Sequence, residues 1–202
     1  MVAVANKRGA PGSRSRDPQL TRERLVEAAA KCFNEAGFLG TDTNRIARAA
    51  GYAPGTFYKH FADKREIFLE AYRRWVDSEW TEIDAIVARG GERERLSADL
   101  TNGILRHHQR WGGFRAALVS LAATDSEVRA FRVDSRKRQM QWLAEALDRL
   151  GSPPAAPARR LAVLLSFERL CDAVAWGESS ALGIKRADVV SELRETLAEL
   201  LG

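Results

Sequence analysis

The sequence predicts an all-helical fold. Apolar residues recur at spacings of three and four along most of the chain, which is the period of an α-helix. One such stripe consists of Phe68, Tyr72, Val76, Trp80, Ile83 and Val87. The sequence has no convincing run of alternating apolar and polar residues, the pattern of a half-buried strand. Glycine, proline and capping residues divide the chain into about nine helices.

The first three expected helices are closely spaced. We expect Thr21 to cap the first helix and Gly37 to end it. A short second helix is expected over about residues 43–50. The third is expected to begin at Pro54, because proline favours the first position of a helix, and to end near Phe61.

The remaining helices are longer. Asp63 is expected to cap a fourth helix that ends at Gly90-Gly91. The helices expected after it cover roughly residues 93–111, 114–123, 126–150, 156–176 and 186–201. The helix over 156–176 is apolar on nearly every side, which indicates burial all round. The last helix carries one apolar stripe, formed by Val189, Leu193, Leu197 and Leu200.

Composition limits the class of protein. Hydrophobic residues make up 45% and charged residues 29% of the sequence, the balance of an ordinary globular protein. No stretch approaches the roughly 20 apolar residues that a membrane span needs, and the start lacks the apolar core of a signal peptide. We therefore expect a cytoplasmic protein with no membrane partner. The net charge of +5 points weakly toward polyanions.

The most informative segment is residues 41–61, which read TDTNRIARAAGYAPGTFYKHF. Two short helices joined by a tight turn at Gly51 form the layout of a helix-turn-helix. Apolar side chains are expected to fasten the pair to the first helix, namely Ile46, Ala47, Phe57 and Phe61. The residues left pointing outward are Pro54, Gly55, Thr56, Tyr58, Lys59 and His60. A helical hairpin without a nucleic-acid role is the alternative.

The outward residues suit contact with DNA. Gly55 and Thr56 are small enough to permit close approach to base edges in the major groove. Tyr58, Lys59 and His60 can donate hydrogen bonds to phosphate oxygens.

At these residues the chain resembles the tetracycline-repressor (TetR) family of regulators. The resemblance covers about residues 21–72, and its most specific part is GTFYKHF at 55–61, followed by Lys64. It implies an N-terminal three-helix, helix-turn-helix DNA-binding domain over 19–66, joined to a C-terminal helical ligand-binding and dimerisation domain over 67–202. It further implies a homodimer, formed through the two C-terminal helices, that binds a palindromic double-stranded DNA operator.

The resemblance also implies roles for single residues. Thr43, Tyr58, His60 and Lys64 are expected to contact phosphates, and Gly55, Thr56 and Asn44 to lie near bases. Asp42 departs from the family, which often has a small hydroxyl residue there; its carboxylate can cap the second helix but is repelled by phosphate. Tyr52 replaces a smaller aliphatic residue and either adds a contact or packs.

Residues 1–18 are expected to form a disordered basic tail. Lys7, Arg8, Arg14 and Arg16 face only one acidic residue, Asp17. Such a tail either keeps the protein in solution or runs along a phosphate backbone. The sequence leaves both interpretations open.

The C-terminal two thirds contain candidates for an apolar effector pocket. They are Trp80, Trp111, Phe114, Phe131, Trp142, Phe167, Cys171 and Trp176, although each taken singly is more typical of core packing. The fourth helix begins next to the third, which is the recognition helix of the motif, and its apolar stripe continues to Val87. A small, largely apolar effector is therefore expected to tilt the fourth helix and release the DNA. A ligand-independent or protein-partnered regulator is the alternative.

Polar residues in this part have simpler interpretations. We interpret Glu168, Arg169 and Asp172 as ion pairs across the dimer interface, in preference to an anchor for the effector. The run at 136–138 is interpreted as a solvated basic face. Adjacent histidines at 107 and 108 diverge by about 100° on a helix and cannot chelate as a pair. We expect no metal and no cofactor.

Two further functional classes are disfavoured. The two cysteines, Cys32 and Cys171, are expected to be buried thiols, since their separation excludes a CxxC motif. No HExxH, GxSxG, P-loop or GxGxxG pattern points to an enzyme.

Overall fold

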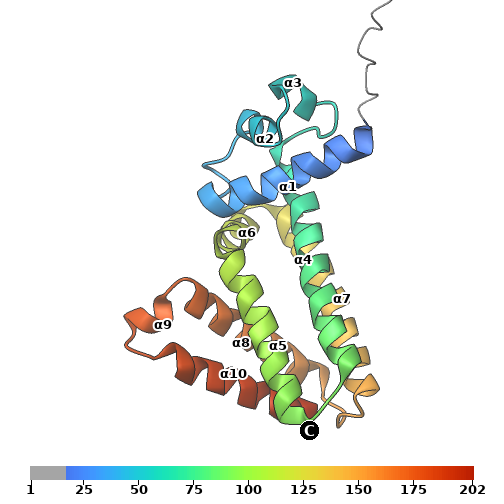
Figure 1. Cartoon of the computed structure of the whole chain (residues 1–202), viewed down its shortest axis with the longest axis vertical. Coiled ribbons are helices and arrows are strands. Elements are labelled where there is room, and N and C mark those ends of the chain that lie inside the picture. Colours follow the sequence, from blue (N-terminus) through green and yellow to red (C-terminus); the bar gives the residue numbers. More distant parts are fainter. Residues whose placement is uncertain (1–16) are drawn as a thin grey trace, which may run out of the picture.

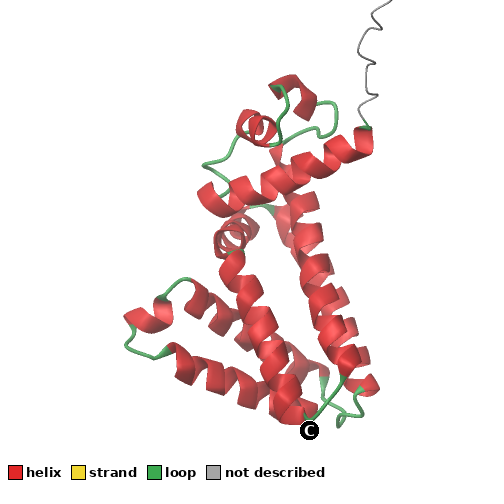
Figure 2. Ribbon diagram, in the orientation of Figure 1, coloured by secondary structure: helices red, strands yellow, loops and turns green. Residues whose placement is uncertain are grey.

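The computed structural model describes residues 17–202, and this range is helical without any strand (Figures 1 and 2). In chain order its helices are α1 (Pro18–Ala36), α2 (Thr43–Ala49), α3 (Pro54–Phe57), α4 (Lys64–Arg89), α5 (Arg93–Arg110), α6 (Gly112–Thr124), α7 (Ser126–Arg149), α8 (Pro157–Ala175), α9 (Glu178–Ala181) and α10 (Arg186–Leu201). The predicted all-helical class is confirmed. The count of about nine helices missed α9, whose four residues are too short to show a period.

The start of α1 differs from the prediction. Asp17, not Thr21, caps this helix, since the Asp17 carboxylate accepts the Gln19 N–H at 2.9 Å. Thr21 lies inside the helix, where its hydroxyl donates to the Asp17 carbonyl. Residues 17 and 18 of the expected tail therefore belong to α1 and its cap. The basic residues Lys7, Arg8, Arg14 and Arg16 lie outside the described residues.

The third helix is also shorter than predicted. It ends at Phe57, after one turn, and not near Phe61. The backbone continues in turns, in which the N–H groups of His60 and Phe61 both donate to the Phe57 carbonyl. The caps predicted at Asp42 and Asp63 and the helix ends predicted at Gly37 and Gly90 are confirmed.

The elements form a small head and a larger body (Figure 1). The head consists of α1, α2 and α3. The helix α4 begins in the head and runs down into the body, where it packs against α5 and α7, while α8 and α10 pack against α5 and each other. Its 26 residues make it about 39 Å long, enough to extend from the head through the body.

Head and body share one apolar core. Phe33 of α1, Phe68 of α4 and Phe114 of α6 are all fully buried, and both the Phe33–Phe68 and the Phe68–Phe114 ring centroids are 5.0 Å apart. Each aromatic pair adds about 0.5–1.5 kcal/mol beyond the area it buries. The core thus runs across the domain boundary expected after residue 66.

A second junction joins α1 to the start of α6. The side chain of the residue before α6 does not cap the first N–H groups of this helix. Asn34 supplies one from α1: its side-chain oxygen accepts the Phe114 N–H at 2.9 Å, and its amide donates to the Arg110 carbonyl at 3.0 Å. The helices are so close here that only glycine fits at position 113.

We predict that Gly113→Ala destabilises the protein. A Cβ at this position would lie 1.9 Å from the Asn34 carbonyl oxygen, so α1 and α6 would have to move apart. Forcing an extra methyl group into a packed interface typically costs about 1–3 kcal/mol. Urea unfolding measures this loss as a lower free energy of unfolding.

The neighbouring Gly112→Ala is the matched control. Its Cβ would meet the Trp176 ring at 3.4 Å, which is ordinary van der Waals contact. Equal destabilisation by the two substitutions would contradict a close contact specific to Gly113.

Candidate DNA-binding site and ligand cavity

Buried apolar side chains anchor the helix-turn-helix in the core of the head. Ile46, Ala47 and Phe57 are fully buried, and Phe61 is 2% exposed. These are the four residues that the sequence predicted to fasten the motif to α1. Gly51 makes the turn between the helices with a φ of 80°, a conformation that favours glycine.

The predicted contact residues share the outer side of the motif. Asn44, Pro54, Gly55, Tyr58 and Lys59 are exposed, whereas Thr43, Thr56, His60 and Lys64 are half-buried. The Thr43 and Tyr58 hydroxyl groups lie 3.0 Å apart, so the start of α2 and the end of α3 present two hydroxyl groups side by side. Tyr52 is half-buried and packs against the core.

Lys64 is already engaged within the chain. Its ammonium donates to the carbonyl groups of Phe38 and Thr41, both at 2.8 Å, and lies 4.2 Å from the centre of the Phe38 ring. Burial lowers the pKa of this amine. Two of its three N–H groups thus hold the loop between α1 and α2, and at most one can reach a phosphate.

Arg22 is a positioning residue that the sequence did not reveal. From α1 its guanidinium donates to the His60 carbonyl at 2.7 Å and lies 4.1 Å from the centre of the Phe61 ring. It therefore ties the turn after α3 to the first helix. Its position in the first turns of an amphipathic helix gave no signal for this role.

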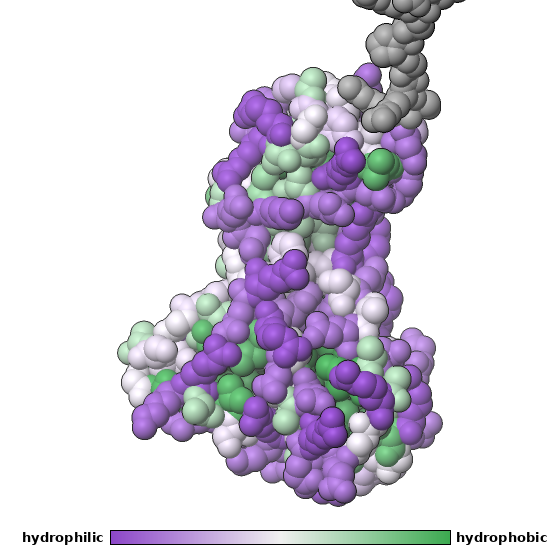
Figure 3. Space-filling view, viewed as in Figure 1, coloured by the Kyte–Doolittle hydropathy of each residue, from purple (hydrophilic) through white to green (hydrophobic). Residues whose placement is uncertain are grey.

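The body contains an apolar cavity of about 90 Å³ between α4, α5, α7, α8 and α10. Three of the predicted pocket residues, Trp80, Trp142 and Phe167, line it. The Trp80 and Trp142 rings meet edge to face, with centroids 4.5 Å apart. Most of the remaining wall is aliphatic and includes Ile83, Val87, Leu100, Ile104, Leu143, Leu147, Leu164 and Leu197. Figure 3 shows that hydrophobic residues also reach the surface of the body in several places.

The other five predicted pocket residues do not line this cavity. They are Trp111, Phe114, Phe131, Cys171 and Trp176. Phe114, with Trp111 and Phe131 against it, belongs to the core between head and body. Cys171 is fully buried in a cluster with Phe167 and Leu193. Trp176 is 43% exposed and donates its indole N–H to the Gly112 carbonyl.

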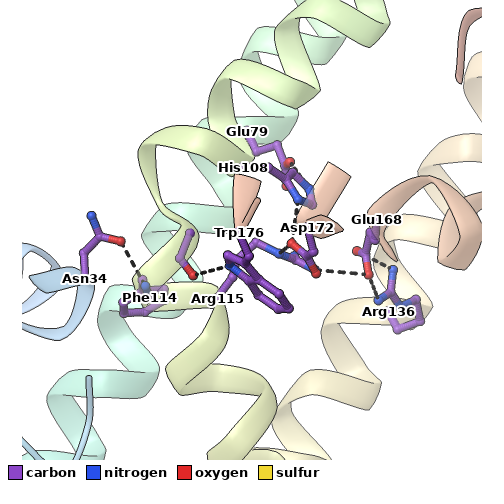
Figure 4. A network of polar contacts seen from close by, with 10 residues as sticks. Asn34, Glu79, His108, Phe114, Arg115, Arg136, Glu168, Asp172 and Trp176 are labelled. Atoms are coloured by element: carbon purple, nitrogen blue, oxygen red, sulfur yellow. Dashed lines mark hydrogen bonds and ion pairs between the residues drawn. The ribbon is translucent and has the colours of Figure 1, made fainter. Parts of the chain in front are cut away.

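A buried network of charges lies at one end of the cavity (Figure 4). Arg115 of α6 binds Asp172 of α8 through two bonds of 2.6 and 2.8 Å, and His108 Nδ1 lies 2.9 Å from the same carboxylate. Arg136 of α7 binds Glu168 of α8 through bonds of 2.8 and 2.7 Å. The network therefore joins α5, α6 and α7 to α8.

These pairs correct two sequence interpretations. Glu168 and Asp172 make their ion pairs inside one chain, and Arg169 pairs with Glu178 of α9, so none of them needs a dimer interface to be satisfied. Arg136 is not simply part of a solvated basic face, because it is bound to Glu168. The largely apolar helix α8 can carry these charged residues because neighbouring helices supply oppositely charged side chains that pair with them.

Burial sets the protonation of the network. Although burial opposes it, hydrogen bonds from His108 and Arg115 hold the pKa of Asp172 at about 2. Burial lowers the pKa of His108 and brings that of His107 to about 3, so both rings are neutral at pH 7. Glu79 of α4 is the exception: burial raises its pKa to about 8, and it carries a proton at neutral pH.

Within residues 17–202, no group of three or more His, Cys, Asp or Glu side chains could hold a metal ion. Both cysteines are free and buried, as predicted. In the same range, no helix combines the length and apolar character needed to cross a membrane.

Comparison with known proteins agrees with this arrangement. Residues 25–71 match the family model of bacterial regulatory proteins, tetR family. The chain is 29% identical over 115 residues to the HTH-type transcriptional repressor AcnR of Corynebacterium efficiens and 27% identical over 119 residues to that of Corynebacterium glutamicum. These matches cover 56% and 58% of each chain, respectively, so the chain spans little more than half the length of these relatives.

Solved structures extend the likeness to the body. A transcriptional regulator from Rhodococcus sp. Rha1 is 26% identical, with a TM-score of 0.71 over 89% of this chain and 95% of that one. The fatty acid degradation regulator FadR of Bacillus halodurans is 15% identical, with a TM-score of 0.68 over 94% and 97%, and shows the fold alone.

Head, body and comparisons together define a helical chain with an N-terminal helix-turn-helix, similar in fold to solved transcriptional regulators. Within residues 25–71 the chain is similar to the tetR family of bacterial regulatory proteins.

We predict that Glu79→Gln makes folding less sensitive to pH. Unfolded Glu79 loses its proton near its ordinary pKa of 4.5, whereas the folded protein keeps it until about pH 8. The free energy of unfolding therefore falls as the pH rises from about 4.5 to about 8, by up to about 1.4 kcal/mol per pH unit for one proton. Glutamine has no proton to lose, so the stability of the variant relative to wild type grows across this window.

Urea unfolding at pH 5, 7 and 8.5 checks this prediction. Glu82→Gln is the control, because Glu82 lies on the same helix but is 46% exposed and pairs with Arg106 at the surface. Wild type, Glu79→Gln and Glu82→Gln changing in parallel with pH would contradict a buried, protonated Glu79.

Proposed function

We propose that the protein is a repressor that binds a palindromic operator as a homodimer and is released by a small, largely apolar effector. The observation that carries this proposal is that one rigid helix, α4, connects the two parts. Its first residue holds the loop before α2, and its middle and last turns form a wall of the cavity. The AcnR relatives are transcriptional repressors, which supports repression over activation. A repressor of this kind acts in the cytoplasm, where its operator is.

The outer side of the helix-turn-helix supports the DNA-binding role. We propose that Gly55, Thr56 and Asn44 lie near base edges, and that Thr43, Pro54, Tyr58, Lys59, His60 and Lys64 contact the phosphate backbone or the groove wall. The first three residues of α3, Pro54, Gly55 and Thr56, are small, and Phe57 after them is buried, which permits close approach to the bases. Lys64 contributes chiefly by fixing the loop before α2, because two of its donors are used there.

The surface of α8 supports a homodimer. Leu161 is 38% exposed and Leu165 is 45% exposed, and with Ala158 and Ala162 they form an apolar stripe at helical spacing on the outside of the chain. A second copy of the chain is the partner we propose for this stripe, with α10 beside it. In such a dimer the two recognition helices must lie about 34–36 Å apart, or a multiple of this distance, to enter successive turns of the major groove.

Contacts in the body supply a path from the cavity to the head. His108 and Glu168 line the cavity, and His108 contacts Asp172, which binds Arg115 of α6. The start of α6 is in turn bound to Asn34 of α1. A ligand that enlarges the cavity would thus displace α4 directly and α6 through these bonds. Either movement changes the separation of the recognition helices.

Selection of binding sites from random DNA duplexes tests the DNA-binding role, and we predict a palindromic site. Lys59→Gln should weaken binding to the selected site and to random DNA by the same factor, because a phosphate carries no base identity. It should also lower the slope of log affinity against log salt by about one. Thr56→Ala should instead change the preferred base, at a cost of about 1–3 kcal/mol on the selected site.

Binding to the selected site and to random DNA, measured over a range of salt, separates these effects. Lys31→Ala, an exposed lysine on α1 outside the motif in sequence, is the control for the loss of one positive charge. Asymmetric selected sites would count against the dimer. Equal losses on both DNAs for Thr56→Ala would count against its contact with a base.

We further predict that the effector and the operator weaken each other's binding by the same factor. A ligand shifts such an equilibrium only through its different affinity for the two states, and typical coupling corresponds to about 5- to 150-fold. Thermal shift with a panel of lipophilic compounds finds a ligand, and calorimetry with and without operator DNA then measures the factor. Asn34→Ala should reduce it, because this residue joins α6 to α1.

Lys31→Ala again serves as the control, here for a change on α1 that leaves its junction with α6 intact. Identical ligand affinities with and without operator would show that ligand binding in the cavity does not affect operator binding. An unchanged coupling factor in Asn34→Ala would exclude the path through α6 and leave α4 as the connection.

A further inference from the structure

The cavity has one polar end in an otherwise apolar wall. Its polar lining residues are Glu79, His108, Glu168 and the uncharged Gln139, and Trp80 follows Glu79 in the wall. The Glu79 side chain is only 9% exposed, and His108 Nε2 lies 3.7 Å from its carboxyl oxygen. This separation is longer than a hydrogen bond.

The charges around Glu79 leave its carboxyl group uncompensated. From the neighbouring elements it faces His108 of α5, Arg115 of α6, Arg136 of α7, and Glu168 and Asp172 of α8. Arg115 is bound to Asp172 and Arg136 to Glu168, so two cations already balance two anions. Glu79 is a third carboxyl group with no cation of its own.

His108 does not supply that cation. Its Nδ1 lies 2.9 Å from the ionised Asp172 carboxylate, so Nδ1 carries the proton and donates it there. Its Nε2, which faces Glu79, is then an acceptor. In the empty cavity Glu79 therefore stays protonated and neutral, which is the cheapest state for a carboxyl group without a partner.

From this arrangement we propose that the cavity binds an apolar molecule with a single positive charge, an amine or quaternary ammonium, whose charged group lies against Glu79. The proposal rests on the proposed function of the cavity as the effector site. It names the class of effector: a lipophilic monocation.

A monocation fits both parts of the cavity. Glu79 releases its proton to solvent and becomes the counter-ion, so the buried charges balance again. Trp80 and Trp142 line the cavity, and aromatic rings attract cations; the aliphatic wall accepts the rest of the molecule. An anion would instead meet Glu79 and Glu168 without a free cation, and a neutral molecule would gain nothing from Glu79.

The cavity is small, so a ligand that enters it must move its walls. At about 90 Å³ it is smaller than the roughly 150 Å³ cavity that accepts benzene in an engineered protein. A ligand must therefore push the walls apart as it enters. The walls include α4, which leads to the head.

Three compounds of similar size and shape test the proposal on the full-length protein. They are benzyltrimethylammonium, its uncharged carbon analogue neopentylbenzene, and the anion 4-phenylbutanoate. Calorimetry in buffers of different ionisation enthalpy measures affinity and the number of protons released. Fluorescence-detected operator binding, run in parallel, measures whether each compound releases DNA.

We expect the cation to bind at least about tenfold more tightly than the other two compounds. Its binding should release close to one proton at pH 7, and its affinity should rise about tenfold per pH unit up to pH 8 and then level off. Glu79→Gln should remove the preference for the cation and the proton release. Glu82→Gln, on the same helix but at the surface, should keep both.

Equal binding of the cation and its uncharged analogue, binding without proton release, or no binding of the cation would each overturn the inference. The proton count on wild type decides this even if Glu79→Gln folds poorly. The proposed function is judged separately: release of operator by the uncharged analogue would leave it standing without this inference. Binding of the cation with proton release but without operator release would support the inference and overturn effector control.

Discussion

The buried pair of Arg115 and Asp172 determines much of the body. It joins α6 to α8 by two short bonds at positions from which water is excluded. A buried guanidinium or carboxylate left without its partner is strongly destabilising, so the two helices can separate only at a high energetic cost. The same carboxylate orients His108, and the neutral ring that results leaves Glu79 without a counter-charge. One ion pair thus sets the packing of α6 and the chemical character of the cavity.

The head is rigid for a different reason. Its three helices are held by a continuous apolar core with α4 and α6, and by polar bonds from Arg22 and Lys64 that end on backbone carbonyl groups. Carbonyl acceptors are fixed by the fold, so these bonds do not depend on further side chains. The helix-turn-helix therefore moves with α1 and α4 as one body. In the function proposed above, an effector would therefore act on the orientation of the head and not on its internal structure.

The sequence contained nearly all of the information on the head and little on the site in the body. Asp42, Asp63, Gly37 and Gly90 mark helix ends through local chemistry, and Ile46 and Phe57 are buried because of a helical period that one sequence shows. The pocket was predicted only from the presence of large rings. That criterion found Trp80 and Trp142, but it also selected Phe114, which fills the core under the head. Burial alone does not distinguish a cavity wall from a packed interior. Glu79 was overlooked because a single acidic residue on a long helix has the pattern of a solvated face. Its protonation depends on charged and titratable side chains on four other helices, which a single sequence does not place near it.

The edge-to-face contact of Trp80 and Trp142 has an optical consequence. Two indole rings with centroids 4.5 Å apart are close enough for their excited states to interact, and both belong to the wall that an incoming molecule must displace. The near-ultraviolet spectrum and the emission of the protein therefore depend on whether the rings touch. The protein carries an intrinsic reporter of cavity opening that needs no label and no DNA.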